Sequence, residues 1–264
     1  MKGLAKSNIG YKGIGADGRP VTWMYGWNPG GFGCSNLEDC PGCWSHSMCH
    51  RSACPDCAAF KVHMHPERLG QPAATKKPGI VLCNFVNDWL DTKRSFFDSE
   101  TIVGCMVPPH IYVTLTKQAI RLSHLVGEMP CLRDDFSGLT IRNQADADAK
   151  LTTFLGIQGN LWLSLEPLWG PVDFGDTWWE TSDACGHGNV RGIIIGHDNR
   201  RGAPGTDTLN HVRSVVKQCQ AAGIPVYVKQ LWLPRGKAKG GLSKDVKDFP
   251  SDLQLRNLPW SSPK

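Results

Sequence analysis

Three cysteines, Cys34, Cys40 and Cys43, lie within ten residues in the sequence CSNLEDCPGC, with the spacing C-x5-C-x2-C. Thiols this close together are typical of metal ligands. A structural zinc ion would need a fourth ligand, because zinc prefers a closed tetrahedron of nitrogen and sulfur donors. A disulfide set is the second alternative. The third is a [4Fe–4S] cluster held by three thiolates, which would leave one iron open to bind a substrate or a cofactor.

A second group of thiols follows in the sequence CHRSACPDC, and its members are Cys49, Cys54 and Cys57. One of three nearby histidines could supply a fourth ligand: His50, His63 or His65. We hypothesise a second metal site here, either zinc or an auxiliary iron–sulfur cluster. The alternatives are loop thiols without a ligand, or a replacement for the first three cysteines as the cluster set. The other five cysteines are expected to be small apolar core residues: Cys83, Cys105, Cys131, Cys185 and Cys219.

The elements that must position these residues are alternating strands and helices. Continuous apolar runs predict six buried parallel strands, at residues 21–27, 79–86, 110–116, 160–166, 190–196 and 224–232. Apolar residues at helical spacing predict helices over residues 118–126 and 209–222. Repeated βα units with right-handed crossovers would form a partial (β/α)6 barrel of the TIM type. We therefore expect an α/β fold in a single domain over residues 1–264, with a cysteine-rich insertion at about 44–75 and a basic C-terminal tail at about 233–264.

Polar residues follow each of these predicted strands after the first, where the carboxyl ends of barrel strands would meet. They are Asn84, Asn87, Asp88, Thr116, Lys117, Glu166, His197, Asp198, Lys229 and Gln230. For any single residue, a loop cap or a salt bridge is the plainer interpretation. For Glu166, the partner in such a salt bridge would be Lys229 or Lys117. Their recurrence from strand to strand favours a site at the mouth of the barrel.

Several segments together resemble a phage-associated family of radical-SAM-like proteins, long labelled a domain of unknown function and related to the spore photoproduct lyase branch of radical SAM enzymes. The resemblance covers nearly the whole chain and is carried in order by WNPGGFGC…CPGCW (27–44), NFVNDWLD (84–91), TLTK (114–117), LSLEPLWGPVD (163–173), IIIGHDNRRGA (193–203), VRSVVKQCQAAGIPVYVKQL (212–231) and VKDFP (246–250). Three features depart from the radical SAM pattern. The familiar C-x3-C-x2-C spacing is C-x5-C-x2-C here, Trp44 replaces a tyrosine, and Gly-Gly-Glu-Ser becomes Gly-His-Asp-Asn at residues 196–199.

This resemblance implies a radical SAM enzyme of the lyase or isomerase type, with a [4Fe–4S] cluster on Cys34, Cys40 and Cys43 and with S-adenosylmethionine (SAM) on the open iron. An external donor of the flavodoxin or ferredoxin type would supply one electron, and a 5′-deoxyadenosyl radical would take a hydrogen from the substrate. The candidate SAM-binding residues are Asn84, Asn87, Asp88, Thr116, Glu166, Asp198 and Trp44. The candidate catalytic residues are Glu166, Lys229, Asp198 and Lys117.

The resemblance also implies a nucleobase in DNA or a nucleotide as substrate, and one specific version is an isomerase step in phage thymidine hypermodification. The formal net charge of +5 agrees with a polyanionic partner. Four tryptophans near strand ends could stack on a base: Trp89, Trp169, Trp178 and Trp179. The basic residues of segment 234–244 could contact phosphates.

Three other functions stay open. They are a non-catalytic, zinc-stabilised nucleic-acid-binding protein, a DNA repair enzyme like spore photoproduct lyase, and an electron-transfer iron–sulfur protein with Cys49 as the fourth ligand. The first residues, MKGLAKSNIGYKG, contain no apolar run as long as that of a signal peptide or a membrane helix. We therefore expect a cytoplasmic protein without a membrane partner, in the host cytoplasm if a phage encodes it.

Overall fold

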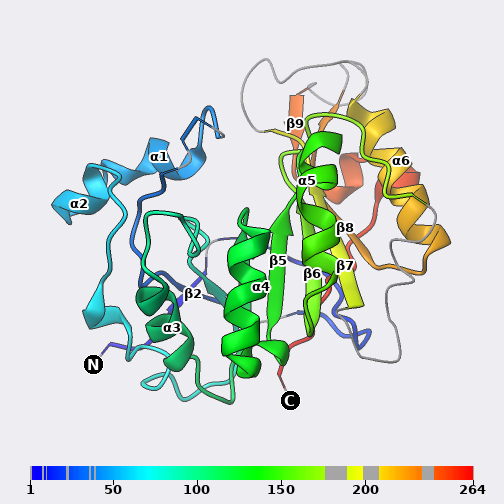
Figure 1. Ribbon diagram of the computed structural model, residues 1–264. Helices are drawn as coiled ribbons and strands as arrows, with labels where there is room; N and C mark the ends of the chain where they lie inside the picture. Colours follow the sequence, from blue (N-terminus) through cyan, green and yellow to red (C-terminus); the bar gives the residue numbers. More distant parts are fainter. Residues whose placement is uncertain are drawn as a thin grey trace. The chain divides into compact units, whose positions relative to one another are not determined.

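The computed structural model describes residues 2–7, 9, 11–21, 24–35, 37–38, 40–175, 189–198, 208–233 and 241–263. The chain divides into two compact units, of which unit 1 holds residues 1–10, 22–138 and 262–264, and unit 2 holds residues 11–21 and 139–261. The described residues form a mixed α/β fold with nine strands, and most of the strand pairs within the two units are parallel (Figure 1). Some residues of the predictions lie outside the described ranges: Trp178, Trp179, Cys185, Asn199 and segment 234–240.

Unit 1 is built on three parallel strands that follow one another in chain order: β2 (Met24–Trp27), β3 (Ile80–Cys83) and β4 (Ile111–Thr116). The short strand β1 (Ala5–Lys6) pairs with β2 in the antiparallel direction. All four residues of β3 are buried. This burial is typical of an apolar parallel strand that is covered on both faces.

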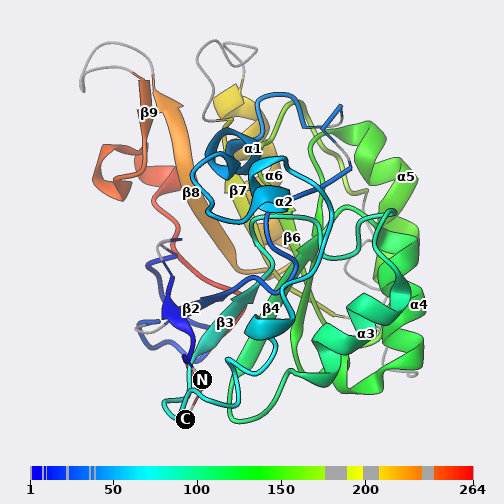
Figure 2. The same ribbon diagram turned by 90° about the vertical axis from the view of Figure 1, so that its left-hand side faces the viewer.

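The helices of unit 1 lie in the connections that follow β2, β3 and β4. The described ones are α1 (Trp44–Cys49), α2 (Pro55–Ala58), η1 (Pro66–Arg68), α3 (Phe96–Gly104), α4 (Ala119–Glu128) and η2 (Pro130–Arg133). The first three belong to the long connection between β2 and β3, and α1 and α2 lie next to each other in both views (Figures 1 and 2). Helix α3 begins after Ser95, whose hydroxyl accepts a hydrogen bond from the N–H of Asp98.

The core of unit 1 includes side chains from the cysteine-rich insertion. Six buried residues form a cluster: Tyr25, Trp27, Val81, Cys83, Ile102 and Tyr112. Met64 and Leu69, which lie within the predicted insertion, pack against this cluster. The insertion is therefore attached to the core of unit 1 by apolar contacts as well as by the chain.

Unit 2 repeats the same arrangement. Its elements are α5 (Gln144–Leu155), β6 (Asn160–Leu165), β7 (Asn189–Gly196), α6 (Thr208–Ala221), β8 (Val226–Leu233), β9 (Gly241–Ser243), η3 (Val246–Asp248) and η4 (Ser251–Leu253). The strands β6, β7 and β8 are parallel and follow chain order, whereas β9 pairs with β8 in the antiparallel direction. The remaining strand, β5 (Phe136–Thr140), begins in unit 1 and ends in unit 2.

The six predicted strands are confirmed as β2, β3, β4, β6, β7 and β8, and the two predicted helices are confirmed as α4 and α6. Strand β5 was not predicted, because its sequence FSGLT contains a serine and a glycine in place of a continuous apolar run. Among the described residues, no helix is both long enough and apolar enough to cross a membrane.

Candidate metal centres

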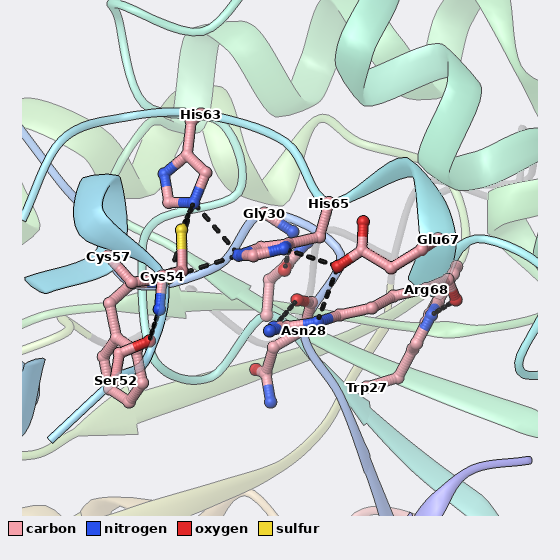
Figure 3. A network of polar contacts seen from close by, with 12 residues as sticks. Trp27, Asn28, Gly30, Ser52, Cys54, Cys57, His63, His65, Glu67 and Arg68 are labelled. Carbon is pink, nitrogen blue, oxygen red and sulfur yellow. Dashed lines mark hydrogen bonds and ion pairs between the residues drawn. The ribbon is translucent and has the colours of Figure 1, made fainter. Parts of the chain in front are cut away.

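Four potential metal ligands of the insertion point toward a common centre in Figure 3. Cys54 directly precedes helix α2, and Cys57 lies in its last turn. The chain then reverses at Phe60, whose backbone is left-handed with φ of 53°, and Lys61 donates its N–H back to the carbonyl of Asp56 at 2.9 Å. This tight reversal returns the chain toward the two thiols and delivers the next imidazoles to them.

The imidazoles are those of His63 and His65, and the four donor atoms lie within 4.8 Å of one another. His63 Nε2 is 3.6 Å from the Sγ of Cys54 and 3.4 Å from the Sγ of Cys57. His65 Nε2 is 3.2 Å from the Sγ of Cys57 and 3.0 Å from His63 Nε2. Cys57 and His65 are buried, whereas Cys54 and His63 are partly exposed. These four residues, the Cys2His2 group, have the donor types that a metal ion requires.

Each imidazole of the Cys2His2 group is oriented by a hydrogen bond from its other ring nitrogen. His65 Nδ1 lies 2.7 Å from Oε1 of Glu67, and His63 Nδ1 lies 2.7 Å from the carbonyl oxygen of Lys61. Both partners are acceptors, so both Nδ1 atoms carry the ring proton. This pattern leaves the Nε2 lone pairs toward the centre, as in metal sites whose histidines are held by carboxylate or carbonyl groups.

The Cys2His2 group could bind a metal ion, and it shares Cys54 and Cys57 with the second predicted metal site but differs from it in the other members. Cys49 lies outside the group, and its thiol donates to the carbonyl oxygen of Ala58 at 3.4 Å. His50 is also outside the group and is exposed. Sequence reasoning considered His63 and His65 as alternatives for one position, whereas the structure uses both. The signal for both was present, because a C-x2-C pair is followed after five residues by H-x-H.

The first three cysteines lie in the connection that leaves β2, before and at the start of helix α1. The N–H of Cys43 donates to the carbonyl of Cys40 at 3.0 Å, and Cys43 occupies the position that precedes α1. All three thiols are partly exposed, and among the described cysteines none forms a disulfide. Trp44, the first residue of α1, is 41% exposed. The predicted cluster ligands therefore occupy the stretch that follows the carboxyl end of the first parallel strand.

Asp91 fixes the start of this stretch and was not predicted. Its carboxylate accepts from the N–H of Ser35 at 2.6 Å and from the hydroxyl of Ser35 at 2.7 Å, and it also forms a hydrogen bond with the Cys34 side chain. Burial opposes ionisation of Asp91. However, the hydrogen bonds from Ser35, Lys93 and Cys34 outweigh it and hold the pKa of this carboxyl below its usual range. The signal for Asp91 was its place at the end of the segment NFVNDWLD.

The predicted SAM-binding amides Asn84 and Asn87 contact the backbone that leads to Cys34. The buried Asn84 accepts from the N–H of Gly30 at 2.9 Å, and Asn87 donates its amide to the carbonyl of Gly31 at 2.6 Å. In the described structure both amides thus hold the connection after β2. The Oδ1 atom of Asn87 is buried without a hydrogen-bond partner, so one polar atom of this pair still faces the protein interior unsatisfied.

Asp88 joins the ends of β3 and β4. Its carboxylate accepts from the hydroxyl of Thr116 at 2.6 Å, from the N–H of Lys117 at 2.9 Å and from the N–H of Leu90 at 3.1 Å. Asp88 and Thr116 are both buried. These hydrogen bonds bring three of the predicted site residues, Asp88, Thr116 and Lys117, together within unit 1.

Two of the predicted residues of unit 2, Glu166 and Lys229, form an ion pair. Lys229 Nζ lies 2.5 Å from Glu166 Oε1 and 5.2 Å from the centre of the Tyr11 ring. Burial alone would lower the pKa of Lys229, but Tyr11 and Glu166 outweigh burial and raise it. The salt bridge that the sequence offered as the plainer interpretation of Glu166 is therefore present. Asp198 accepts from the indole N–H of Trp169 at 3.1 Å.

His197 and Gln230 hold the ends of β7 and β8 together. Gln230 donates its amide to the carbonyl of His197 at 2.7 Å, and His197 Nδ1 accepts from the N–H of Trp232 at 2.8 Å. Burial lowers the pKa of His197. Both side chains thus stabilise the contact between the ends of β7 and β8.

Two further predictions need correction. Trp89 is fully buried, so its ring has no exposed face for a base. Cys131 is exposed rather than a core residue, because it lies in the short helix η2 at the surface, and Cys105 is only partly buried. Cys83 and Cys219 are buried, as predicted.

The chain is thus a mixed α/β protein with a cysteine- and histidine-rich insertion that could bind a metal ion. Residues 20–248 match the model of a protein family described as "Protein of unknown function (DUF5131)", and the chain belongs to this family. No curated protein and no solved structure matches the chain.

Proposed function

We propose that this protein is a radical SAM enzyme that acts on a nucleobase or a nucleotide, with a [4Fe–4S] cluster on Cys34, Cys40 and Cys43. The observation that carries the proposal is the position of these thiols. All three are partly exposed, none is in a disulfide, and they follow the carboxyl end of the first parallel strand. Chemistry in barrels of parallel strands is located at the carboxyl ends of the strands.

The strand order supports the fold that this proposal requires. In a doubly wound sheet the strand order reverses at a switch point. In unit 1 the order β2-β3-β4 follows the chain, and in unit 2 the order β6-β7-β8 does so as well. Parallel strands added in chain order are what a partial TIM-type barrel contains, and we propose that architecture for the whole chain.

The donor set fits the cluster chemically. Three thiolates would bind three different irons, so they need not converge on one point as the ligands of a single ion do. When bound, such a cluster would hold SAM on its open iron and supply a radical that abstracts hydrogen. The residues of this chain would orient the cluster loop. Asp91 holds Ser35 and Cys34, while Asn84 and Asn87 hold the backbone just before them.

The substrate part of the proposal rests on charge and on the resemblance in sequence. The net charge of +5 favours a polyanionic partner. Trp44 is 41% exposed next to Cys43 and offers a ring face on which a base could stack. We propose an isomerase step on a modified thymidine as the specific reaction to be tested, with free nucleotides tried before DNA because a base in a duplex must first be flipped out.

The test is SAM cleavage by the protein after anaerobic reconstitution with iron and sulfide. With dithionite as the electron source, we expect a brown protein that forms 5′-deoxyadenosine. The variant with Cys34→Ala, Cys40→Ala and Cys43→Ala should be inert. Cys131→Ala serves as the matched control, because this thiol is exposed but lies outside the proposed cluster. Cleavage that persists in the triple variant would refute the assignment.

The Cys2His2 group favours a second candidate function, a zinc-stabilised module that binds nucleic acid without catalysis. That candidate predicts a colourless protein that carries zinc after reconstitution, binds an oligonucleotide and leaves SAM intact. Iron content and SAM cleavage measured on the same sample distinguish the two candidates, because only the radical SAM enzyme needs both.

A further inference from the structure

The Cys2His2 group has the dimensions of a single tetrahedral metal site. Bond lengths of about 2.3 Å to sulfur and 2.0–2.1 Å to nitrogen in a tetrahedron place sulfur and nitrogen about 3.6 Å apart and two nitrogens about 3.3 Å apart. Three of the four sulfur–nitrogen distances are 3.6, 3.4 and 3.2 Å, the nitrogen–nitrogen distance is 3.0 Å, and all four donor atoms lie within 4.8 Å of one another. The donors therefore surround a volume suited to one ion.

The hydrogen bonds of the two histidines orient their donor atoms toward a cation at this centre. Because Lys61 O and Glu67 are acceptors, the ring protons lie on the Nδ1 atoms of His63 and His65. Two Nε2 lone pairs then face each other at 3.0 Å, with the two sulfur atoms beside them. A single metal ion at the centre would coordinate all four donor atoms at once, with both imidazoles held in the required orientation.

The donor types and spacing select zinc. An S2N2 tetrahedron is typical of zinc or of an iron–sulfur centre. In a Rieske-type cluster, however, the cysteines bind one iron and the histidines bind the other. Here His63 Nε2 is within 3.6 Å of both thiols, so cysteine and histidine share one centre. We propose that Cys54, Cys57, His63 and His65 bind one Zn²⁺ ion and that this ion fixes the segment 29–33, which leads into Cys34.

The contacts of segment 29–33 with the Cys2His2 group carry the second half of the proposal. The N–H of Phe32 donates to Cys57 Sγ at 3.3 Å, and the N–H of His65 donates to the carbonyl of Pro29 at 2.7 Å. A Cβ atom on Gly31 would lie 2.7 Å from the His63 ring and 2.9 Å from the His65 ring. The backbone of this segment is therefore packed directly on the proposed zinc ligands.

A second layer of contacts joins the same two parts. Arg94 is buried, and its guanidinium donates to the carbonyl of His63 at 3.0 Å and to the carbonyl of Gly30 at 3.3 Å. Loss of the ion would free the two thiols and two imidazoles. The packing of Gly30 and Gly31 against this part of the insertion would then weaken. As a result, segment 29–33 would hold Cys34 less firmly.

The zinc half of this inference is independent of the proposed enzymatic function, and metal analysis tests it directly. The full-length protein, purified without added iron, should contain zinc at one ion per chain. Cys57→Ser and His65→Ala should lose zinc affinity by at least about tenfold, since each removes a ligand. Cys49→Ser is the matched control, because this buried thiol is close in sequence but outside the group. Cobalt substitution should give the intense visible bands of a tetrahedral thiolate site in the wild type and in Cys49→Ser.

The triple variant Cys34→Ala, Cys40→Ala, Cys43→Ala separates this proposal from the proposed function. It should retain zinc and the cobalt spectrum even though it cannot hold a cluster. Zinc lost in the triple variant but kept in Cys57→Ser would place the ion on the first three cysteines and would overturn both proposals. Zinc kept in all variants, or absent from the wild type, would overturn the zinc site alone.

The positioning half is tested by thiol alkylation with iodoacetamide, followed by mass spectrometry of Cys34. Removal of zinc by a chelator should speed labelling of Cys34 by about tenfold, as expected when local structure opens. In Cys57→Ser, Cys34 should already react fast and should not respond to the chelator. The fully buried Cys83 in β3 reports on the fold of unit 1 and should stay unlabelled throughout. Unchanged labelling of Cys34, or simultaneous labelling of Cys83, would overturn the specific effect on segment 29–33.

Discussion

The ion pair between Glu166 and Lys229 can be tested by a double-mutant cycle, because the structure predicts how strongly the two side chains are coupled. Two unit charges at 4 Å interact by about 4 kcal/mol at an effective dielectric constant of 20. The cost of removing both groups from water offsets much of this attraction. The side chain of Lys229 is 23% exposed and that of Glu166 is 18% exposed, so some solvent screening remains. We therefore expect a coupling free energy of about 1–2 kcal/mol.

The variants are Glu166→Gln, Lys229→Met and the double variant. Glutamine keeps the shape of Glu166, and methionine keeps the apolar stem of Lys229 that packs near Tyr11. Each single variant should lower the free energy of unfolding by about 2 kcal/mol, because each leaves a partly buried charge without its partner. The double variant should lose less than the sum of the two single losses, by the coupling free energy.

Urea unfolding followed by tryptophan fluorescence measures these free energies, with the same m-value required in all four proteins. A coupling below about 0.5 kcal/mol would refute the reasoning, since it would lie within the error of additivity. Such a result would favour a role for Glu166 and Lys229 in contacts with a ligand over a role in stability.

Two further predictions concern single residues. Gly33→Ala should destabilise the protein by about 3 kcal/mol or more. The φ of Gly33 is +137°, and a Cβ atom there would lie 2.0 Å from the carbonyl oxygen of Lys61. Thermal unfolding measures this loss. Burial would raise the pKa of Asp146, but Arg142 and Lys150 outweigh it and lower the pKa from 3.8 to about 2. Asp146→Asn should therefore cost about 2 kcal/mol at pH 7. Because the folded pKa is depressed, this difference should be complete above pH 4 and should vanish as the pH falls toward 2, in urea titrations at several pH values.

Both predictions have a matched control. Gly175→Ala also places alanine at a positive φ, +73°, but nothing lies within 4 Å of its Cβ, so it should cost only about 1 kcal/mol. Asp148 lies on the same helix as Asp146 but is exposed, so the Asp148→Asn variant should change the free energy of unfolding by less than about 0.5 kcal/mol. Equal losses for Gly33→Ala and Gly175→Ala would contradict the proposed clash. A pH-independent loss in Asp146→Asn would contradict the role assigned to its charge.

The regular elements could be predicted from the sequence because their signals are local. The buried run IVLC of β3 and the helical spacing of Val212, Val215 and Val216 in α6 each lie within one element. Strand β5 was missed because its sequence, FSGLT, has no continuous apolar run, and strand formation by such a sequence depends on its packing context.

The candidate sites were predicted only in part, because their geometry depends on local backbone turns and on contacts between residues far apart in the sequence. The spacing of cysteines identified Cys54 and Cys57, but the reversal at Phe60 that brings both histidines to them has no clear sequence signal. Likewise, the position of Asn84 after β3 suggested a ligand contact. Its bond to Gly30, 54 residues away, could be seen only in the structure.

The packing of the insertion on unit 1 limits how this protein can be shortened. A chain trimmed of residues 44–75 would leave Trp27, which is fully buried, without the carbonyl of Arg68 that accepts its indole N–H at 2.9 Å. It would also lose Met64 and Leu69 from the core cluster. Homologous proteins with a shorter connection between β2 and β3 must therefore cover this tryptophan position in another way, or carry a smaller side chain there.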